Sequence, residues 1–235
     1  MKTLGFRVVF LIIAIGIYIY DASYLNFTLF PQGIISRIFL LTFWIMLFVG
    51  MIFRIFPNKR ISAGAGRHFV AVDSSVDKVP HELVGPFNKK TRAVAVVWVV
   101  FNGILFMGLR FFNLMTPAVA LLISLFYTLC DVLFIVIWCP FQKFFMQNRC
   151  CTECRIYNWD YLMMVTPLIF FPSVFSLILV AFALIVFIRW ELAAARNPYV
   201  FLPKAGNCAA CGDRLCFIKK RLGRAVSSKS NKGVI

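Results

Sequence analysis

Seven of the eight cysteines lie in polar segments beside apolar runs, and four of them form two closely spaced pairs. Cys151 and Cys154 make one pair, and Cys208 and Cys211 make the other. Two residues between thiols allow both sulfurs to bind the same metal ion, so each pair is a chelating unit. Three further candidate ligands flank the pairs, namely Cys139, Cys150 and Cys216.

Ligand sets made only of thiolates suit either an iron-sulfur cluster or a structural zinc ion. The spacing does not decide between them, because zinc ribbons place roughly 15 to 20 residues between their two pairs. Here an apolar segment separates Cys154 from Cys208. We favour an iron-sulfur cluster and keep zinc as the alternative. A third interpretation is thiol-disulfide exchange, since Arg149 and Arg155 would favour the thiolate form of the first pair. Palmitoylated or simply buried cysteines are the plainer alternatives.

A second group of candidate residues is polar and lies inside apolar segments. Asp131 stands well within such a segment, where an ionisable side chain is costly and is a candidate for a functional role. Asn102 falls at a similar depth on the preceding segment. A hydrogen bond between them would serve helix packing, and a proton or ion relay is the functional alternative.

The composition identifies the elements that must position these residues. Hydrophobic residues make up 61% of the 235 residues and charged residues 14%, and the mean hydropathy is +0.85. A soluble domain is roughly half apolar and a quarter charged. The chain is therefore predicted to be an all-α integral membrane protein in a lipid bilayer. The basic residues that give the net charge of +16 lie between and after the apolar runs, so they indicate topology, and no nucleic-acid partner is expected.

Two transmembrane hairpins are predicted from the apolar runs, each long enough to span a bilayer. Residues 8–30 and 34–56 form the first, and residues 93–112 and 117–138 form the second. A proline-broken fifth hydrophobic segment follows. The full division is a first hairpin (1–56), a basic loop (57–92), a second hairpin (93–138), a cysteine-rich segment (139–160), the proline-broken segment (161–190) and a basic, cysteine-containing tail (191–235) whose end is expected to be disordered.

The basic loop sets the expected orientation. Counted from Arg54 to Arg92, it has eight basic and three acidic residues, a net charge of 8 − 3 = +5. The positive-inside rule therefore predicts a cytoplasmic loop and a cytoplasmic N-terminus, with the protein in the inner (plasma) membrane of the cell.

The fifth segment has two interpretations, because Pro167 and Pro172 interrupt its first half. In one, residues 161–172 enter the membrane and residues 173–190 return, so the tail stays cytoplasmic. In the other, residues 161–190 make one kinked crossing and the tail is external. We favour the hairpin slightly, because a single crossing would place a strongly basic tail outside.

The stretches Cys139–Gln142 and Asn148–Asp160 read CPFQ and NRCCTECRIYNWD. This pattern resembles a motif of a cysteine-rich, multi-pass family of bacterial membrane proteins, and the resemblance implies no particular activity. The hypothesis from the sequence is a membrane protein whose cysteines hold a metal centre for electron transfer at the cytoplasmic face, with a quinone or a redox partner subunit. A structural zinc site in a transporter or scaffold and a membrane thiol oxidoreductase are the alternatives.

Overall fold

The computed structural model describes residues 2–28, 33–56, 84–136, 139–146, 156 and 159–196, and all its regular elements in these ranges are helical. Four helices are long and apolar enough to cross a membrane. They are α2 (Ile34–Ile55), the apolar part of α4 (Lys89–Phe111), α5 up to Phe134 and α7 (Val174–Arg196). The all-α membrane fold predicted from the sequence is confirmed.

The first hairpin pairs α1 (Lys2–Tyr20) with α2. The first segment was expected to continue to Phe30, but α1 ends at Tyr20 and a short 3₁₀ helix, η1 (Ala22–Leu25), follows. Asp21 explains the stop, because its carboxylate accepts a hydrogen bond from Ser23 N at 2.8 Å and caps η1. This bond also lowers the pKa of the exposed Asp21 carboxyl. The second segment begins and ends within one residue of its predicted bounds.

The second hairpin pairs α4 (Val84–Phe111) with α5 (Pro117–Val136). The chain reverses through Asn113, which has a left-handed φ of 56°, a conformation that asparagine tolerates better than most residues. Thr116 then accepts a hydrogen bond from Val119 N at 3.3 Å, and Pro117 occupies the first turn, as is usual at a helix start. Helix α4 begins inside the stretch predicted as loop, since polar residues extend the helix beyond its apolar part.

The proline-broken segment forms a third hairpin. Helix α6 (Asp160–Val165) continues into the 3₁₀ helix η7 (Thr166–Phe170), and the chain then turns back into α7. Ser173 and Ser176 cap the start of α7 reciprocally, with N to Oγ distances of 2.8 and 3.2 Å. A short arm followed by a return is the geometry of the hairpin interpretation, and residues 160–196 do not form one kinked helix.

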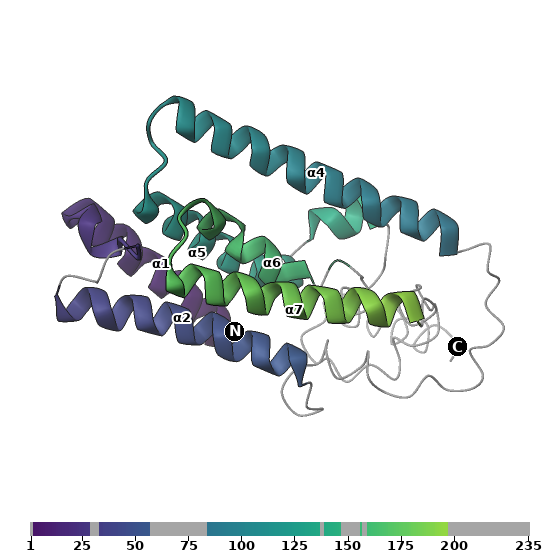
Figure 1. Cartoon of the computed structure of the whole chain (residues 1–235), viewed down its shortest axis with the longest axis horizontal. Helices are drawn as coiled ribbons and strands as arrows, with labels where there is room; N and C mark the ends of the chain where they lie inside the picture. The colour runs from purple at the N-terminus through teal and green to yellow at the C-terminus, as the bar shows by residue number, and fades with distance from the viewer. Residues whose placement is uncertain are drawn as a thin grey trace, which may run out of the picture.

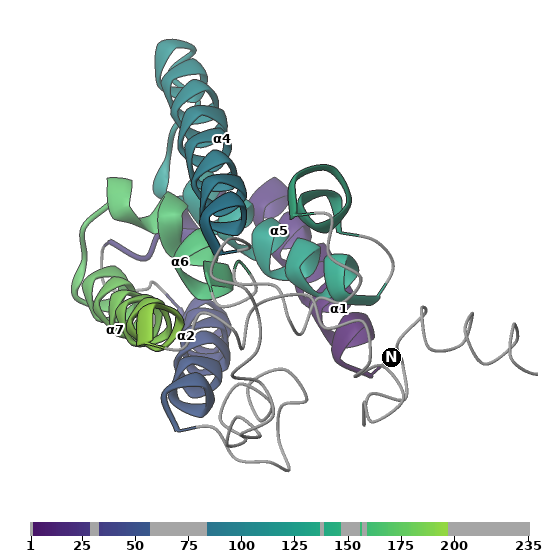
Figure 2. The ribbon, with the colours of Figure 1, turned by 90° about the vertical axis from the view of Figure 1, so that its right-hand side faces the viewer.

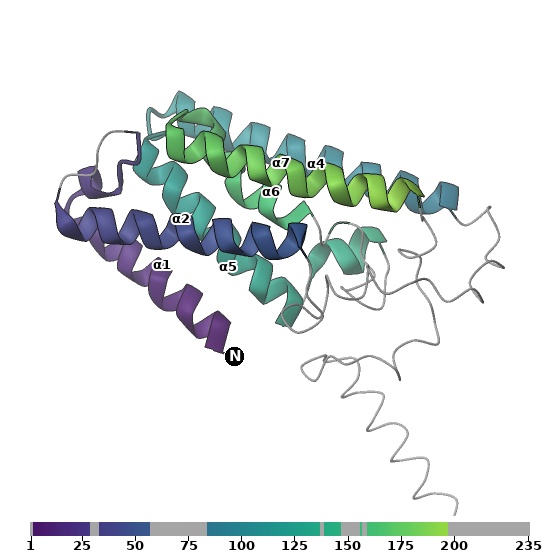
Figure 3. The same ribbon diagram turned by 60° about the horizontal axis from the view of Figure 1, so that its bottom comes forward.

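The three hairpins lie side by side, as Figure 1 shows, with their turns at the left of the view. The start of α1 and the end of α7 both lie toward the opposite end, which is also visible in Figure 3. The six apolar segments therefore alternate in direction along the chain. The π-helical turn η4 (Phe141–Met146) packs beside α4 at the end where α6 begins.

The core lies between α2 and α7 and between α1 and α5. Buried residues recur on α2 at four-residue intervals, which places them on one helix face: Phe39, Phe43, Leu47 and Met51. Phe39 stacks on Phe10 of α1, with ring centres 4.4 Å apart. Helix α2 also packs along α7, whose buried residues include Leu179, Ala183, Val186 and Trp190. Helix α4 leans away from the other helices in Figure 2, and its apolar window is the least buried of the four.

Candidate functional site

A buried ion pair joins the end of α2 to the start of α6. Arg54 Nη2 lies 2.7 Å from Asp160 Oδ2, and the two side chains are 8% and 7% exposed. The second carboxylate oxygen of Asp160 accepts a hydrogen bond from Tyr161 N at 2.9 Å. Both carboxylate oxygens are thus bonded, as a buried charge requires.

Gly50 and Tyr161 bring these two helices close together. A side-chain carbon at position 50 would collide with the Tyr161 hydroxyl, so the absence of a side chain allows the tyrosine to rest on the backbone of α2. The Arg54 guanidinium carbon lies 5.8 Å from the centre of the Tyr161 ring, within the range of a cation–π contact. The ion pair is therefore held by packing as well as by charge.

A second ion pair joins the start of α1 to the end of α5. Arg7 Nη1 lies 3.0 Å from Asp131 Oδ2 and also donates to the carbonyl oxygen of Thr128. Each side chain of this pair is 16% exposed, about twice the exposure of the Arg54–Asp160 pair. The carboxylates of Asp131 and Asp160 interact electrostatically with each other and with Arg54. We call these four residues, Arg7, Arg54, Asp131 and Asp160, the charge cluster.

The charge cluster has no net charge, because two arginines face two aspartates. It forms where four separate segments end or begin, at the same end of the bundle. Each carboxylate of the cluster is bonded to a guanidinium, and the guanidinium stays protonated at any ordinary pH. This arrangement favours a positioning role over transfer of a proton from Asp131.

Asn102 has a different partner from the one we expected. Its amide nitrogen donates to Trp98 O at 2.9 Å, and its amide oxygen accepts from the Tyr127 hydroxyl at 2.9 Å. Asp131 binds Arg7 on α1, one turn of helix further along α5 than Tyr127. The two intramembrane polar residues therefore belong to separate contacts, and the one at Asn102 attaches α4 to α5.

A hydrogen bond also closes the third hairpin, at the end of the bundle that carries the charge cluster. Trp159 Nε1 donates to Glu191 Oε1 at 2.8 Å, which joins the residue before α6 to the last part of α7. Trp159 is 8% exposed and packs on Phe187 with ring centres 5.7 Å apart. Trp159, at the entry to α6, and the last part of α7 are consequently held together at one end of the bundle.

Most of the predicted metal ligands lie outside the described residues: Cys150, Cys151, Cys154, Cys208, Cys211 and Cys216. The described cysteines are Cys130 within α5 and Cys139 just before η4, and both are partly buried and form no disulfide. Within the described ranges, no group of three or more histidine, cysteine, aspartate or glutamate side chains is arranged to hold a metal ion.

The sequence indicated Asp131 but not its partner, and it did not indicate Arg54 and Asp160 as a pair. Arg54 counted as a topology charge of the basic loop, and Asp160 as the end of the cysteine-rich segment. A signal was present, since both residues stand at the boundary of an apolar run, where a charge has to reach water or another charge. No protein-family model matches the chain, and no curated protein or solved structure matches it.

Proposed function

We propose that the two cysteine pairs of this membrane protein together hold one thiolate-ligated metal centre, an iron-sulfur cluster in the favoured form, which transfers electrons at the membrane surface. The partners would be a quinone or a redox partner subunit. The observation that supports this proposal is the closure of the third hairpin by Trp159 and Glu191. It brings the chain back to the end of the bundle from which the first cysteine pair departs.

Chain length allows the two pairs to meet. Cys154 precedes Asp160 by 160 − 154 = 6 residues, and Cys208 follows Arg196 by 208 − 196 = 12 residues. Extended chain spans about 3.3 to 3.6 Å per residue, so these connections reach roughly 20 Å and 40 Å from the bundle. Both distances are ample for pairs that start from neighbouring helix ends, whereas a single kinked crossing would have separated them by the bilayer.

The charge cluster would hold the start of α6, near the first cysteine pair in the sequence, in a fixed position. Asp160 is bonded to Arg54 on α2, so the segment that follows the first cysteine pair is anchored to the core. A metal site needs ligands held close to their final geometry, and ligands attached to packed elements meet that need better than ligands on free chain. We assign the charge cluster this positioning role.

The test is metal analysis of protein purified without oxygen, with paired cysteine-to-serine substitutions. Wild type is expected to contain iron and acid-labile sulfide. Because one centre uses both pairs, Cys151→Ser/Cys154→Ser and Cys208→Ser/Cys211→Ser should each lose the whole metal content. Cys130→Ser is the matched control, since Cys130 lies within α5 and belongs to neither pair, and it should keep the metal.

Other results would point elsewhere. Stoichiometric zinc would favour the structural zinc site of a transporter or scaffold, and a redox-cycling disulfide without metal would favour the thiol oxidoreductase. Loss of half of the metal in each double variant would mean two independent sites. A fourfold serine variant that keeps its metal and its fold would refute the proposal.

We also propose that the end of the bundle with the charge cluster faces the cytoplasm of the inner (plasma) membrane, because the basic loop follows α2 at that end. Labelling of Cys151 and Cys208 with a membrane-impermeant maleimide in vesicles of both orientations tests this. After removal of the metal, both cysteines should react only in inverted vesicles. Reaction of the two from opposite sides would contradict the shared site.

A further inference from the structure

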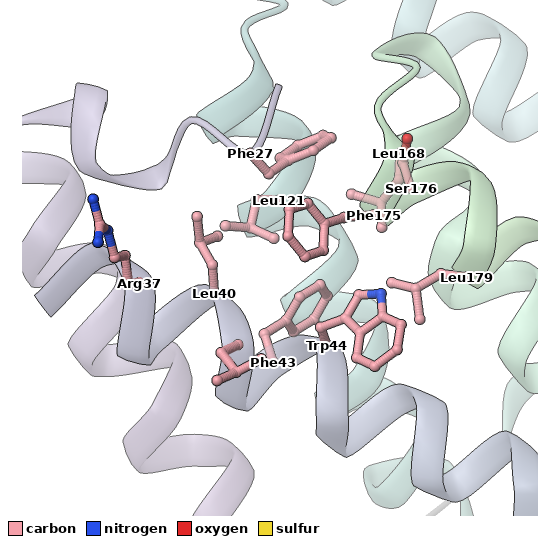
Figure 4. A pocket seen from close by; sticks show the side chains of 11 residues that line it. Phe27, Arg37, Leu40, Phe43, Trp44, Leu121, Leu168, Phe175, Ser176 and Leu179 are labelled. Atoms are coloured by element: carbon pink, nitrogen blue, oxygen red, sulfur yellow. The ribbon is translucent and has the colours of Figure 1, made fainter. Parts of the chain in front are cut away.

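A cavity of about 370 Å³ opens between α2, α5, η7 and α7, and its size is that of a small-ligand pocket. Four aromatic side chains line it: Phe27, Phe43, Trp44 and Phe175. Figure 4 shows Arg37 at one end of this pocket and the Trp44 ring beside Leu179 at the other. Among the described residues, neither the charge cluster nor Cys130 and Cys139 line it.

The pocket follows one face of α2 from the membrane edge to the middle of the helix. Arg37 lies in the first turn of α2, and Trp44 lies seven residues further along, which corresponds to about 10 Å of helix. Leu41, between them, is 53% exposed on a helix that is long and apolar enough to cross a membrane. The pocket is thus accessible from the membrane, while its deep end at Trp44 is midway along α2.

Trp44 carries the one polar feature at the deep end. Its indole nitrogen is buried, and no acceptor among the described residues bonds to it. A buried donor without an acceptor costs on the order of 1 to 3 kcal/mol. A ligand that places an oxygen at this depth would remove that cost.

We propose that this pocket binds the ring of a membrane-soluble quinone. A planar conjugated ring fits walls of aromatic side chains, which favour stacked and edge contacts. A ring carbonyl would accept the Trp44 N–H bond, and the apolar tail would leave past Leu41 into the bilayer. This inference deepens the proposed electron-transfer function by locating its lipid-soluble partner, but quinone binding does not depend on the metal.

The Trp44 N–H, which has no acceptor among the described residues, favours a quinone over the acyl chain of a phospholipid. The oxygens of a phospholipid lie in its head group and ester linkages, at the level of Arg37 or just below it. An acyl chain that extends to Trp44 would bring only methylene groups to the N–H. A quinone carries its acceptors on the ring itself, so the ring can lie deep and still satisfy the donor.

The test is calorimetric titration of the purified full-length protein in detergent with a short-chain alkyl benzoquinone. Wild type should bind one equivalent saturably. Trp44→Phe keeps an aromatic wall but removes the N–H, and it should weaken binding about tenfold, the effect of one hydrogen bond. Trp98→Phe, which changes an indole on α4 outside the pocket, is the matched control and should bind like wild type. Leu40→Trp should fill the pocket and abolish binding.

Several outcomes would overturn the inference: no saturable binding by wild type, equal affinities of the Trp44 and Trp98 variants, or full binding by Leu40→Trp. A brominated phosphatidylcholine that quenches Trp44 and displaces the quinone probe would identify the occupant as an acyl chain instead. The titration is repeated on the fourfold serine variant of Cys151, Cys154, Cys208 and Cys211. Retained quinone binding without metal would separate this inference from the proposed metal centre.

Discussion

Removal of one member of the Arg54–Asp160 pair is expected to destabilise the bundle strongly. At 2.7 Å and an effective dielectric constant near 20, the two charges attract each other by about 6 kcal/mol. Desolvation of each ion costs several kcal/mol, so the intact pair contributes little net stability. Asp160→Asn leaves the Arg54 charge buried with its attraction lost, and such a change typically costs about 3 to 5 kcal/mol.

The assay is unfolding of the purified protein in mixed micelles with increasing mole fraction of sodium dodecyl sulfate, followed by tryptophan fluorescence. Asp160→Asn should unfold at a much lower detergent fraction than wild type. Arg196→Gln is the matched control, because Arg196 is an exposed arginine in the last turn of α7, and it should change the free energy of unfolding by less than about 0.5 kcal/mol. The double variant Arg54→Met/Asp160→Leu should be more stable than Asp160→Asn, since it leaves no lone charge.

The second pair provides an internal comparison. Arg7 and Asp131 are each 16% exposed, so the charge that remains after one is removed is less deeply buried than in the Arg54–Asp160 pair. Asp131→Asn should therefore cost less than Asp160→Asn, about 1 to 3 kcal/mol. An Asp160→Asn variant as stable as Arg196→Gln, or one less affected than Asp131→Asn, would refute the reasoning that burial of the pair sets its effect.

Three further predictions concern single contacts. Gly50→Ala should destabilise the protein by about 1 to 3 kcal/mol through its collision with the Tyr161 hydroxyl, and Tyr161→Phe in the same chain should recover part of the loss in the same unfolding assay. Asn102→Leu should cost roughly 0.6 to 2 kcal/mol because the Tyr127 hydroxyl loses its acceptor, while in a Tyr127→Phe background the same change should cost less. The lowered pKa of Asp21 means that its cap stabilises the fold above the pKa of the unfolded chain and is lost as the pH falls through the folded-state pKa, so Asp21→Asn should flatten the acid limb of a stability-versus-pH curve.

The sequence predicted the long elements well, because their signal is local. Spans of apolar residues fix where α2 and α5 begin, and the breaks at Gly33 and Pro117 mark the boundaries. The predicted end of α1 was wrong, because one side-chain hydrogen bond at Asp21 outweighed the apolar content of the residues that follow it. Helix α4 starts before the predicted segment, because hydropathy indicates where the apolar part begins and not where the helix begins.

The partners of the charged residues were beyond prediction for a different reason. Arg54 interacts with Asp131 as well as with Asp160 in the folded chain, and Arg7 also interacts with Asp131, so more than one pairing was compatible with the sequence. The choice depends on the register between helices that are distant in sequence, and an apolar helix surface carries little information about register. Asn102 illustrates the point, since we expected it to bond to Asp131 and it bonds to Tyr127.

Polar contacts can supply that register. Between lipid and helix there is no hydrophobic driving force, so apolar packing alone distinguishes poorly between neighbouring positions of two helices. Each of the six apolar segments described has at least one polar side chain bonded to another segment or to the residue that leads into it. Arg7 and Asp131 join α1 to α5, Arg54 and Asp160 join α2 to α6, Asn102 joins α4 to α5, and Glu191 joins α7 to Trp159. Because slippage by one residue would break a bond of this kind and bury a charge or a donor in lipid, these contacts fix the ends of the bundle, and with them the points from which both cysteine-bearing segments depart.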